Sequence, residues 1–123
     1  MTCQPGAGPA VIVPLAGEID LTNREQVYDR LYAAFVSGAA VVIADFTAAR
    51  FCDCGSLRRV LSVQQAAARG GQLRLVIPPG NPVRRLADLT GVEGRLHIYS
   101  SVREATVWLG HAPRSVRDER FIS

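Results

Sequence analysis

The fold is decided by the stretch FCDCGSL, residues 51–57, together with the apolar run VVIADF at residues 41–46 that precedes it. The run has the length of one strand, and its lack of polar alternation predicts a strand buried on both faces, as in a parallel sheet. The residues after Asp53 repeat their apolar positions with a helical period, so the stretch predicts a tight turn that opens a helix. The unpaired N–H groups at such a helix start favour negative charge.

The alternation of strands and helices continues on both sides of this turn. Strands are predicted at residues 11–15, 41–46, 73–77 and 96–99. Helices are predicted between residues 22 and 38, 53 and 70, 81 and 91, and 101 and 109. Capping boxes are expected at residues 22–25 and 101–104, and Asn81 is expected to cap a helix that has Pro82 as its first residue. The order predicts an α/β fold in which a mostly parallel mixed sheet packs against about four helices.

Length and composition indicate one domain. The chain has 123 residues, 48% of them hydrophobic, which is enough for a substantial core. We expect a domain at residues 10–110 between an N-terminal segment, residues 1–9, and a polar C-terminal tail, residues 111–123. The sequence has no apolar run of the roughly 20 residues that a membrane span needs, and no export signal, so a cytoplasmic protein without a membrane contact is expected.

The charge distribution and the absence of known motifs exclude several classes of function. The formal net charge is +3 and all 14 basic residues are arginines, dispersed along the chain rather than clustered among aromatics, so no direct nucleic-acid contact is expected. A phosphate-binding loop of the Walker type needs a lysine, as does a phospho-acceptor receiver domain, and the chain has none. The serine-hydrolase elbow G-x-S-x-G is also missing. The sequence therefore predicts a protein that is not an enzyme.

The cysteines and histidines do not form a metal-binding pattern. The cysteines are Cys3, Cys52 and Cys54, an odd number that fits no disulfide framework. The two histidines, His97 and His111, fall in a predicted strand and in the tail. A zinc site needs about four ligands, so neither a metal nor another cofactor is expected.

The arrangement of these elements resembles that of a STAS domain. The resemblance rests on GEID at residues 17–20, on the turn FCD at residues 51–53, and on PVRRLADLTG at residues 82–91, and it runs from about Val11 to Leu109. This family includes bacterial anti-sigma factor antagonists and the cytoplasmic domains of sulfate transporters. The use of arginine for every basic residue is typical of actinobacterial members. The resemblance implies a role in transcription regulation during stress response or development.

The resemblance also implies a partner and a switch. Soluble members of the family bind an anti-sigma factor, a serine kinase of the histidine-kinase ATPase fold, and thereby free a sigma factor. The kinase ends this state by phosphorylating a serine at the start of the second helix, in a turn usually spelled Asp-Ser-Ser-Gly-Leu. A phosphate adds a charge of about −1.5 to −2, which repels nearby acids at a docking surface.

In this chain, the turn at residues 53–57 departs from that family sequence. Asp53 matches the family Asp, Cys54 the first Ser and Leu57 the Leu, whereas Gly55 falls on the acceptor position and Ser56 on the Gly. A shift by one residue turns a helical side chain by about 100°. Three hypotheses follow: Ser56 is a displaced phosphoacceptor, the chain binds its partner without being switched by phosphorylation, or it has a different ligand or a scaffolding role.

We therefore predict an anti-sigma factor antagonist that binds its partner through the Asp20 loop and the central turn. The candidate site residues are Asp20, Asp53, Cys54, Gly55, Ser56, Leu57 and Arg58. Arg58 and Arg59 are either a solvated helix face or contacts for acidic partner residues. The alternative function is that of a ligand-binding, scaffolding or sensory STAS domain with the helix start at residues 55–56 as its site. A homodimer is left open.

Overall fold

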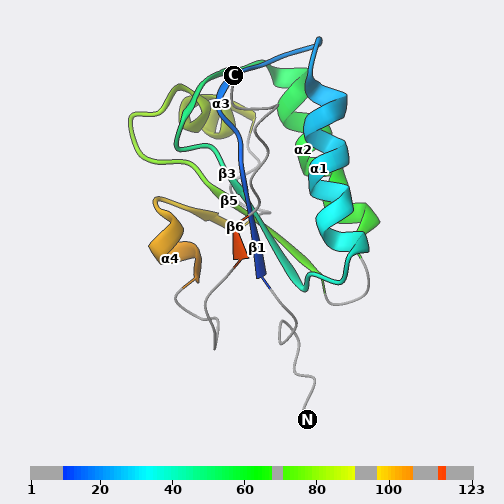
Figure 1. Ribbon diagram of the computed structural model, residues 1–123. Coiled ribbons are helices and arrows are strands. Elements are labelled where there is room, and N and C mark those ends of the chain that lie inside the picture. Colours follow the sequence, from blue (N-terminus) through cyan, green and yellow to red (C-terminus); the bar gives the residue numbers. More distant parts are fainter. Residues whose placement is uncertain (1–9, 68–70, 91–96, 107–113, 116–123) are drawn as a thin grey trace.

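The computed structural model describes residues 10–67, 71–90, 97–106 and 114–115, and Cys3 and His111 lie outside them. The helices and strands follow one another in an alternating order along the chain (Figure 1). They are β1 (Ala10–Pro14), β2 (Gly17–Ile19), α1 (Arg24–Val36), β3 (Val41–Asp45), β4 (Ala49–Cys52), α2 (Cys54–Ala66), β5 (Gln72–Val76), α3 (Pro82–Thr90), β6 (His97–Tyr99), α4 (Val102–Thr106) and β7 (Arg114–Ser115). Among these helices, none is long and apolar enough to cross a membrane.

The central sheet has the strand order β6-β5-β3-β1-β7, and each of these pairings is parallel. The predicted α/β fold with a mostly parallel sheet is therefore confirmed. The outermost strand β7 belongs to the stretch expected to be a polar tail, and it pairs with Val11 and Ile12 of β1. Pro14 lies beyond that pairing, where its missing N–H interrupts no ladder with β7.

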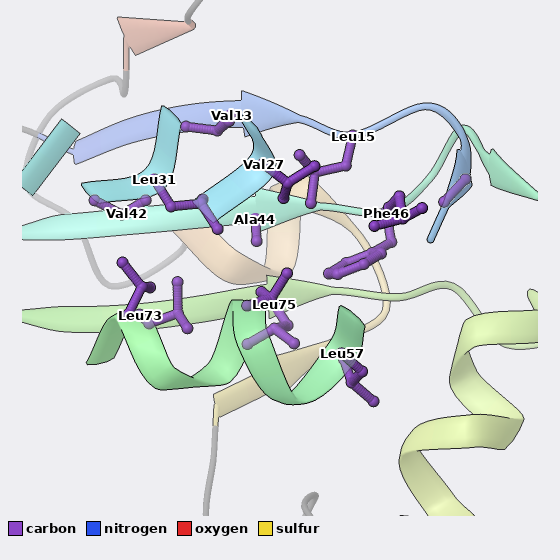
Figure 2. Packing of buried hydrophobic residues seen from close by; sticks show 14 of the residues in the cluster. Val13, Leu15, Val27, Leu31, Val42, Ala44, Phe46, Leu57, Leu73 and Leu75 are labelled. Atoms are coloured by element: carbon purple, nitrogen blue, oxygen red, sulfur yellow. The ribbon is translucent and has the colours of Figure 1, made fainter. Parts of the chain in front are cut away.

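Helices α1 and α2 cover one face of the sheet, and the short helix α4 lies against the other (Figure 1). Side chains alternate between the faces along each strand, so Ala44 joins the core under α1 and α2 while Ile43 joins the cluster under α4. Figure 2 shows the larger core, in which Leu31 of α1 and Leu57 of α2 pack with buried residues of the strands. This core holds the first turns of α1 and α2 in place.

A second, two-stranded parallel sheet was not predicted from the sequence. It joins β2 to β4, with Glu18 opposite Phe51 and Ile19 opposite Cys52. The predicted turn at residues 51–53 is therefore a strand end followed by a helix cap. The strands have only three and four residues and pair across a long sequence separation, so no local pattern marks them. This small sheet carries the Asp20 loop and the start of α2 side by side.

One of the predicted helix caps is wrong and the others hold fully or in part. The Thr22 hydroxyl donates to Asp20 Oδ1 at 2.6 Å instead of capping α1, and Asn23 occupies the N-cap position without a side-chain cap bond. Thr22 instead belongs to a local turn, in which both its backbone N–H and its hydroxyl donate to the Asp20 carboxylate two residues earlier. At α3, Asn81 Oδ1 accepts from Val83 N at 2.8 Å, as predicted. At α4, Ser101 Oγ accepts from Glu104 N, but the Glu104 carboxylate reaches Ser100 N.

Candidate functional site

The predicted site residues come together where α1 and α2 begin. We call residues 53–58 the central turn, and the loop between β2 and α1 the Asp20 loop. The backbone N–H of Asp53 donates to the carbonyl of Ile19 at 3.2 Å, which joins the central turn to the strand before the Asp20 loop. Residues predicted from two distant stretches of sequence therefore form one surface region.

Asp53 caps α2. It has an extended backbone, with φ −81 and ψ 166, and its Oδ1 accepts a hydrogen bond from Ser56 N at 2.7 Å. The same oxygen lies 3.3 Å from Nη2 of Arg24. Hydrogen bonds from Ser56, together with the Arg24 charge, hold the pKa of the Asp53 carboxyl below its usual value, although burial acts in the opposite direction. The acid of the turn is thus ionised and already bonded within the chain.

Replacing Asp53 with alanine is expected to lower the free energy of unfolding at neutral pH by about 1 kcal/mol, the usual cost of a lost N-cap. Because the pKa of this carboxyl is lowered in the folded state, its contribution is present above the unfolded pKa. We therefore expect the difference between wild type and variant to shrink as the pH falls below about 4. Urea unfolding at pH 7 and at pH 3 measures both effects. Asp53→Asn, which keeps a capping oxygen, is the control and should lose less.

Ser56 points inward. Its relative exposure is 0%, and its Oγ accepts a hydrogen bond from Arg24 Nε at 3.2 Å. The hydroxyl does not cap the helix, since Asp53 does. A kinase that uses the folded chain as substrate would have no access to this oxygen. The Ser56 N–H, which the anion-binding alternative would need, already donates to Asp53.

Gly55 lies directly beneath the Arg24 guanidinium. A Cβ atom built on Gly55 would stand 2.8 Å from Nη2 and 3.0 Å from Nη1 of Arg24. Distances below 3.0 Å do not occur for real Cβ atoms, so any side chain here forces the guanidinium to move. The absence of a side chain at Gly55 is therefore what allows Arg24 to bridge to Asp53 and Ser56. We call these three residues the Arg24 clamp.

Asp20 is engaged in its own loop. Its Oδ1 accepts from the backbone N–H of Thr22 at 3.0 Å and from the Thr22 hydroxyl. Its backbone carbonyl accepts from Arg24 N at 2.9 Å, which ties the loop to the first residue of α1. Asp20 thus positions the helix from which Arg24 reaches the central turn.

The two arginines of α2 that follow Leu57 have different surroundings. Arg59 forms two-pronged hydrogen bonds with Glu25, with Nη2 at 2.9 Å from Oε1, and its guanidinium carbon lies 3.7 Å from the centre of the Tyr28 ring. Arg58 is exposed, and within the described residues it has no acid or other acceptor. The Tyr28 ring in turn stacks on Tyr32 at 6.0 Å. Arg59 is therefore a structural link between α1 and α2, whereas Arg58 is an exposed cation that takes no part in this link.

The two cysteines of the site differ in accessibility. Burial raises the pKa of the Cys52 thiol to about 12, whereas Cys54 begins α2 and is partly exposed. Both are free thiols, and the described residues contain no group of side chains suited to a metal ion.

Alkylation of the folded protein with iodoacetamide at pH 8 is expected to modify Cys54 and to leave Cys52 intact, because the thiolate is the reactive form. Peptide mapping by mass spectrometry separates the two positions, and a sample alkylated in denaturant, where both should react, is the control. Modification of Cys52 at the rate of Cys54 in the folded state would contradict this prediction.

Sequence reasoning missed Arg24 as a site residue. It was expected only as an interior member of the Thr22 capping box, while the residues it joins lie 29 and 32 positions later in the chain. An arginine in a first helical turn, where the helix dipole disfavours cations, is a weak local signal that it has a partner elsewhere. The pairing itself depends on the packing of α1 against α2.

Comparison with known proteins gives a family for this chain and several solved structures that are similar to it. No curated protein matches the chain. The structure is similar to an anti-sigma factor antagonist from Mycobacterium paratuberculosis, with a TM-score of 0.72 at 18% identity over 81% of this chain and 86% of the other. It is also similar to a protein from Thermotoga maritima described as a putative anti-sigma factor antagonist, with a TM-score of 0.70 at 20% identity over 82% and 88%.

A third similar structure is the anti-sigma factor antagonist SpoIIAA in its unphosphorylated form, with a TM-score of 0.60 at 20% identity over 87% of this chain and 91% of the other. At these identities the structures establish the shared fold. The sequence model of the STAS domain matches residues 1–105, which include the Asp20 loop, the central turn and nearly all described elements. The chain therefore belongs to the STAS domain family.

Proposed function

We propose that this chain is an anti-sigma factor antagonist that binds an anti-sigma factor, a serine kinase of the histidine-kinase ATPase fold, and so frees a sigma factor. Support comes from the family and from three similar structures, two described as anti-sigma factor antagonists and one as a putative anti-sigma factor antagonist. The observation that carries the proposal is the joining of the Asp20 loop and the central turn at one end of α1 and α2. A surface held by these bonds needs little ordering when a partner docks.

The central turn in this proposal is a docking element that phosphorylation does not switch. Gly55 stands at the family's acceptor position and has no hydroxyl, while Ser56 is fully buried and bonded to Arg24. A phosphate on Ser56 would place about two negative charges in a buried position next to Asp53. The burial of Ser56 therefore favours the unswitched antagonist over the displaced acceptor.

The test mixes the pure protein with each candidate anti-sigma kinase of its host, with and without Mg-ATP. Size-exclusion chromatography reports complex formation, and intact mass reports phosphate. A stable complex without added mass, preserved in Ser56→Ala, is the expected result. A phosphate that Ser56→Ala abolishes would show that the switch has moved to Ser56. Binding to no candidate would overturn the antagonist proposal in favour of a ligand-binding or scaffolding STAS domain.

A further inference from the structure

The acids of the central turn and of the Asp20 loop are used within the chain. Asp53 Oδ1 accepts from Ser56 N and lies against Arg24, and Asp20 Oδ1 accepts from two groups of Thr22. Carboxylates that already accept such bonds attract an incoming cation less than free ones do. Asp53 is therefore offset by Arg24, and Asp20 already serves as an acceptor for two groups of its own loop.

The two arginines next to these acids have N–H groups that no acceptor among the described residues binds. Within the described residues Arg58 has no partner, and Nη1 of Arg24 has no acceptor, although Nε and Nη2 do. The Arg24 side chain is a quarter exposed, at 25%. Arg58 lies one helical turn after Gly55, so it shares the helix face over which the Arg24 guanidinium sits. Two guanidinium groups thus flank the same part of α2.

Two exposed apolar side chains lie in the Asp20 loop and in the strand that leads into the central turn. Leu21 in the Asp20 loop is 73% exposed and Phe51 at the end of β4 is 48% exposed. The pairing of β2 with β4 brings their two segments together, since Ile19, two residues before Leu21, is opposite Cys52, next to Phe51. Arg50 beside Phe51 is already paired with Glu18. Large apolar groups beside free cations are typical of a protein-binding surface.

We propose that the partner binds here through an acidic segment, with a carboxylate between Arg24 and Arg58 and an apolar side chain against Leu21 and Phe51. This inference rests on the proposed function and specifies that the partner contributes acidic and apolar side chains to the contact. The charge complementarity is directed, because Asp53 is offset by Arg24 and Asp20 already accepts two bonds within its loop, whereas Arg58 has no acceptor within the described residues. The clamp holds Arg24 in position, while Arg58 provides the freely accessible charge.

The test uses the anti-sigma kinase that the wild-type chain captures in the mixing experiment, with affinity measured by titration calorimetry at two salt concentrations. Arg58→Glu is expected to weaken binding by about tenfold or more and to flatten the salt dependence, because a favourable charge pair becomes a repulsive one. Arg58→Gln should lie between it and wild type. Arg103→Glu, on exposed α4 at the other face of the sheet, makes the same charge change and should alter affinity less than about twofold.

The outcomes separate the two proposals. Restoration of Arg58→Glu binding by reversing one carboxylate of the partner would identify the contact directly, by the logic of a double-mutant cycle. Wild-type binding with no loss in Arg58→Glu, or with an equal loss in Arg103→Glu, would overturn the acidic contact while leaving the antagonist function in place. Failure of the wild-type chain to bind any candidate would overturn both.

Discussion

Replacing Leu57 with alanine is expected to lower the free energy of unfolding by about 2–5 kcal/mol, the range for large-to-small changes in a packed core. Leu57 is 1% exposed and is the first large apolar side chain of α2, directly after the buried Ser56. Figure 2 shows it among the side chains of the main core. The cavity would loosen the first turn of α2, so partner affinity should fall together with stability. Urea unfolding followed by circular dichroism measures the first effect.

Leu61→Ala removes the same atoms from the next turn of α2, where the side chain is only partly buried, and it is the matched control. Its loss of stability should be clearly smaller. Equal losses at the two positions would mean that Leu57 has no special role in anchoring the central turn, and that general packing of α2 accounts for both effects.

Under the proposed function, introducing serine at Gly55 is expected to create a phosphoacceptor. Incubated with its partner kinase and Mg-ATP, Gly55→Ser should gain one phosphate, and wild type none. The new Cβ would lie 2.8 Å from Arg24 Nη2, so the end of this flexible side chain must shift, which weakens its bonds to Asp53 and Ser56. If that displacement costs about 1.4 kcal/mol, adding Arg24→Ala to Gly55→Ser should speed transfer about tenfold. Intact mass against time, at saturating kinase, measures both rates.

Gly55→Ala is the control for this pair, since it displaces Arg24 in the same way and offers no hydroxyl. It should gain no phosphate. Two results would contradict the account: phosphate on Ser56 of the natural chain, which would require the buried hydroxyl to be accessible, or equal rates for Gly55→Ser with and without Arg24, which would mean that the guanidinium is no obstacle.

Local sequence patterns predicted the α/β alternation because each depends on residues close together in the chain. The uninterrupted apolar run became β3, at the centre of the parallel sheet, and Asn81 caps α3 through a bond to a residue two positions away. The predicted cap at Thr22 failed for a similarly local reason. The Thr22 oxygen was expected to accept from a backbone N–H of the first helical turn, but the hydroxyl donates to Asp20 instead, and the sequence does not say which of these bonds forms.

The candidate site was predicted in its location but not in its internal bonding. The sequence placed Asp53, Gly55 and Ser56 at a helix start and the resemblance brought in Asp20. It did not predict that Ser56 is buried, because a helical period of about 3.6 residues leaves the orientation of a first turn undecided. It did not predict the pairing of β2 with β4, which joins two strands of three and four residues.

The sequence by itself determined the family, the alternation of the longer strands with the helices, and the absence of a hydroxyl at position 55, since these depend on residue identities and short spacings. Only the tertiary structure decided what surrounds Gly55 and Ser56. Arg24 and Ser56 are 32 residues apart, and they meet because buried side chains of α1 and α2 pack the two helices on the same sheet face. Long-range packing brings the guanidinium over Gly55 and next to Asp53, and it leaves Arg58 exposed and without an acceptor in the part of the chain that the structure describes.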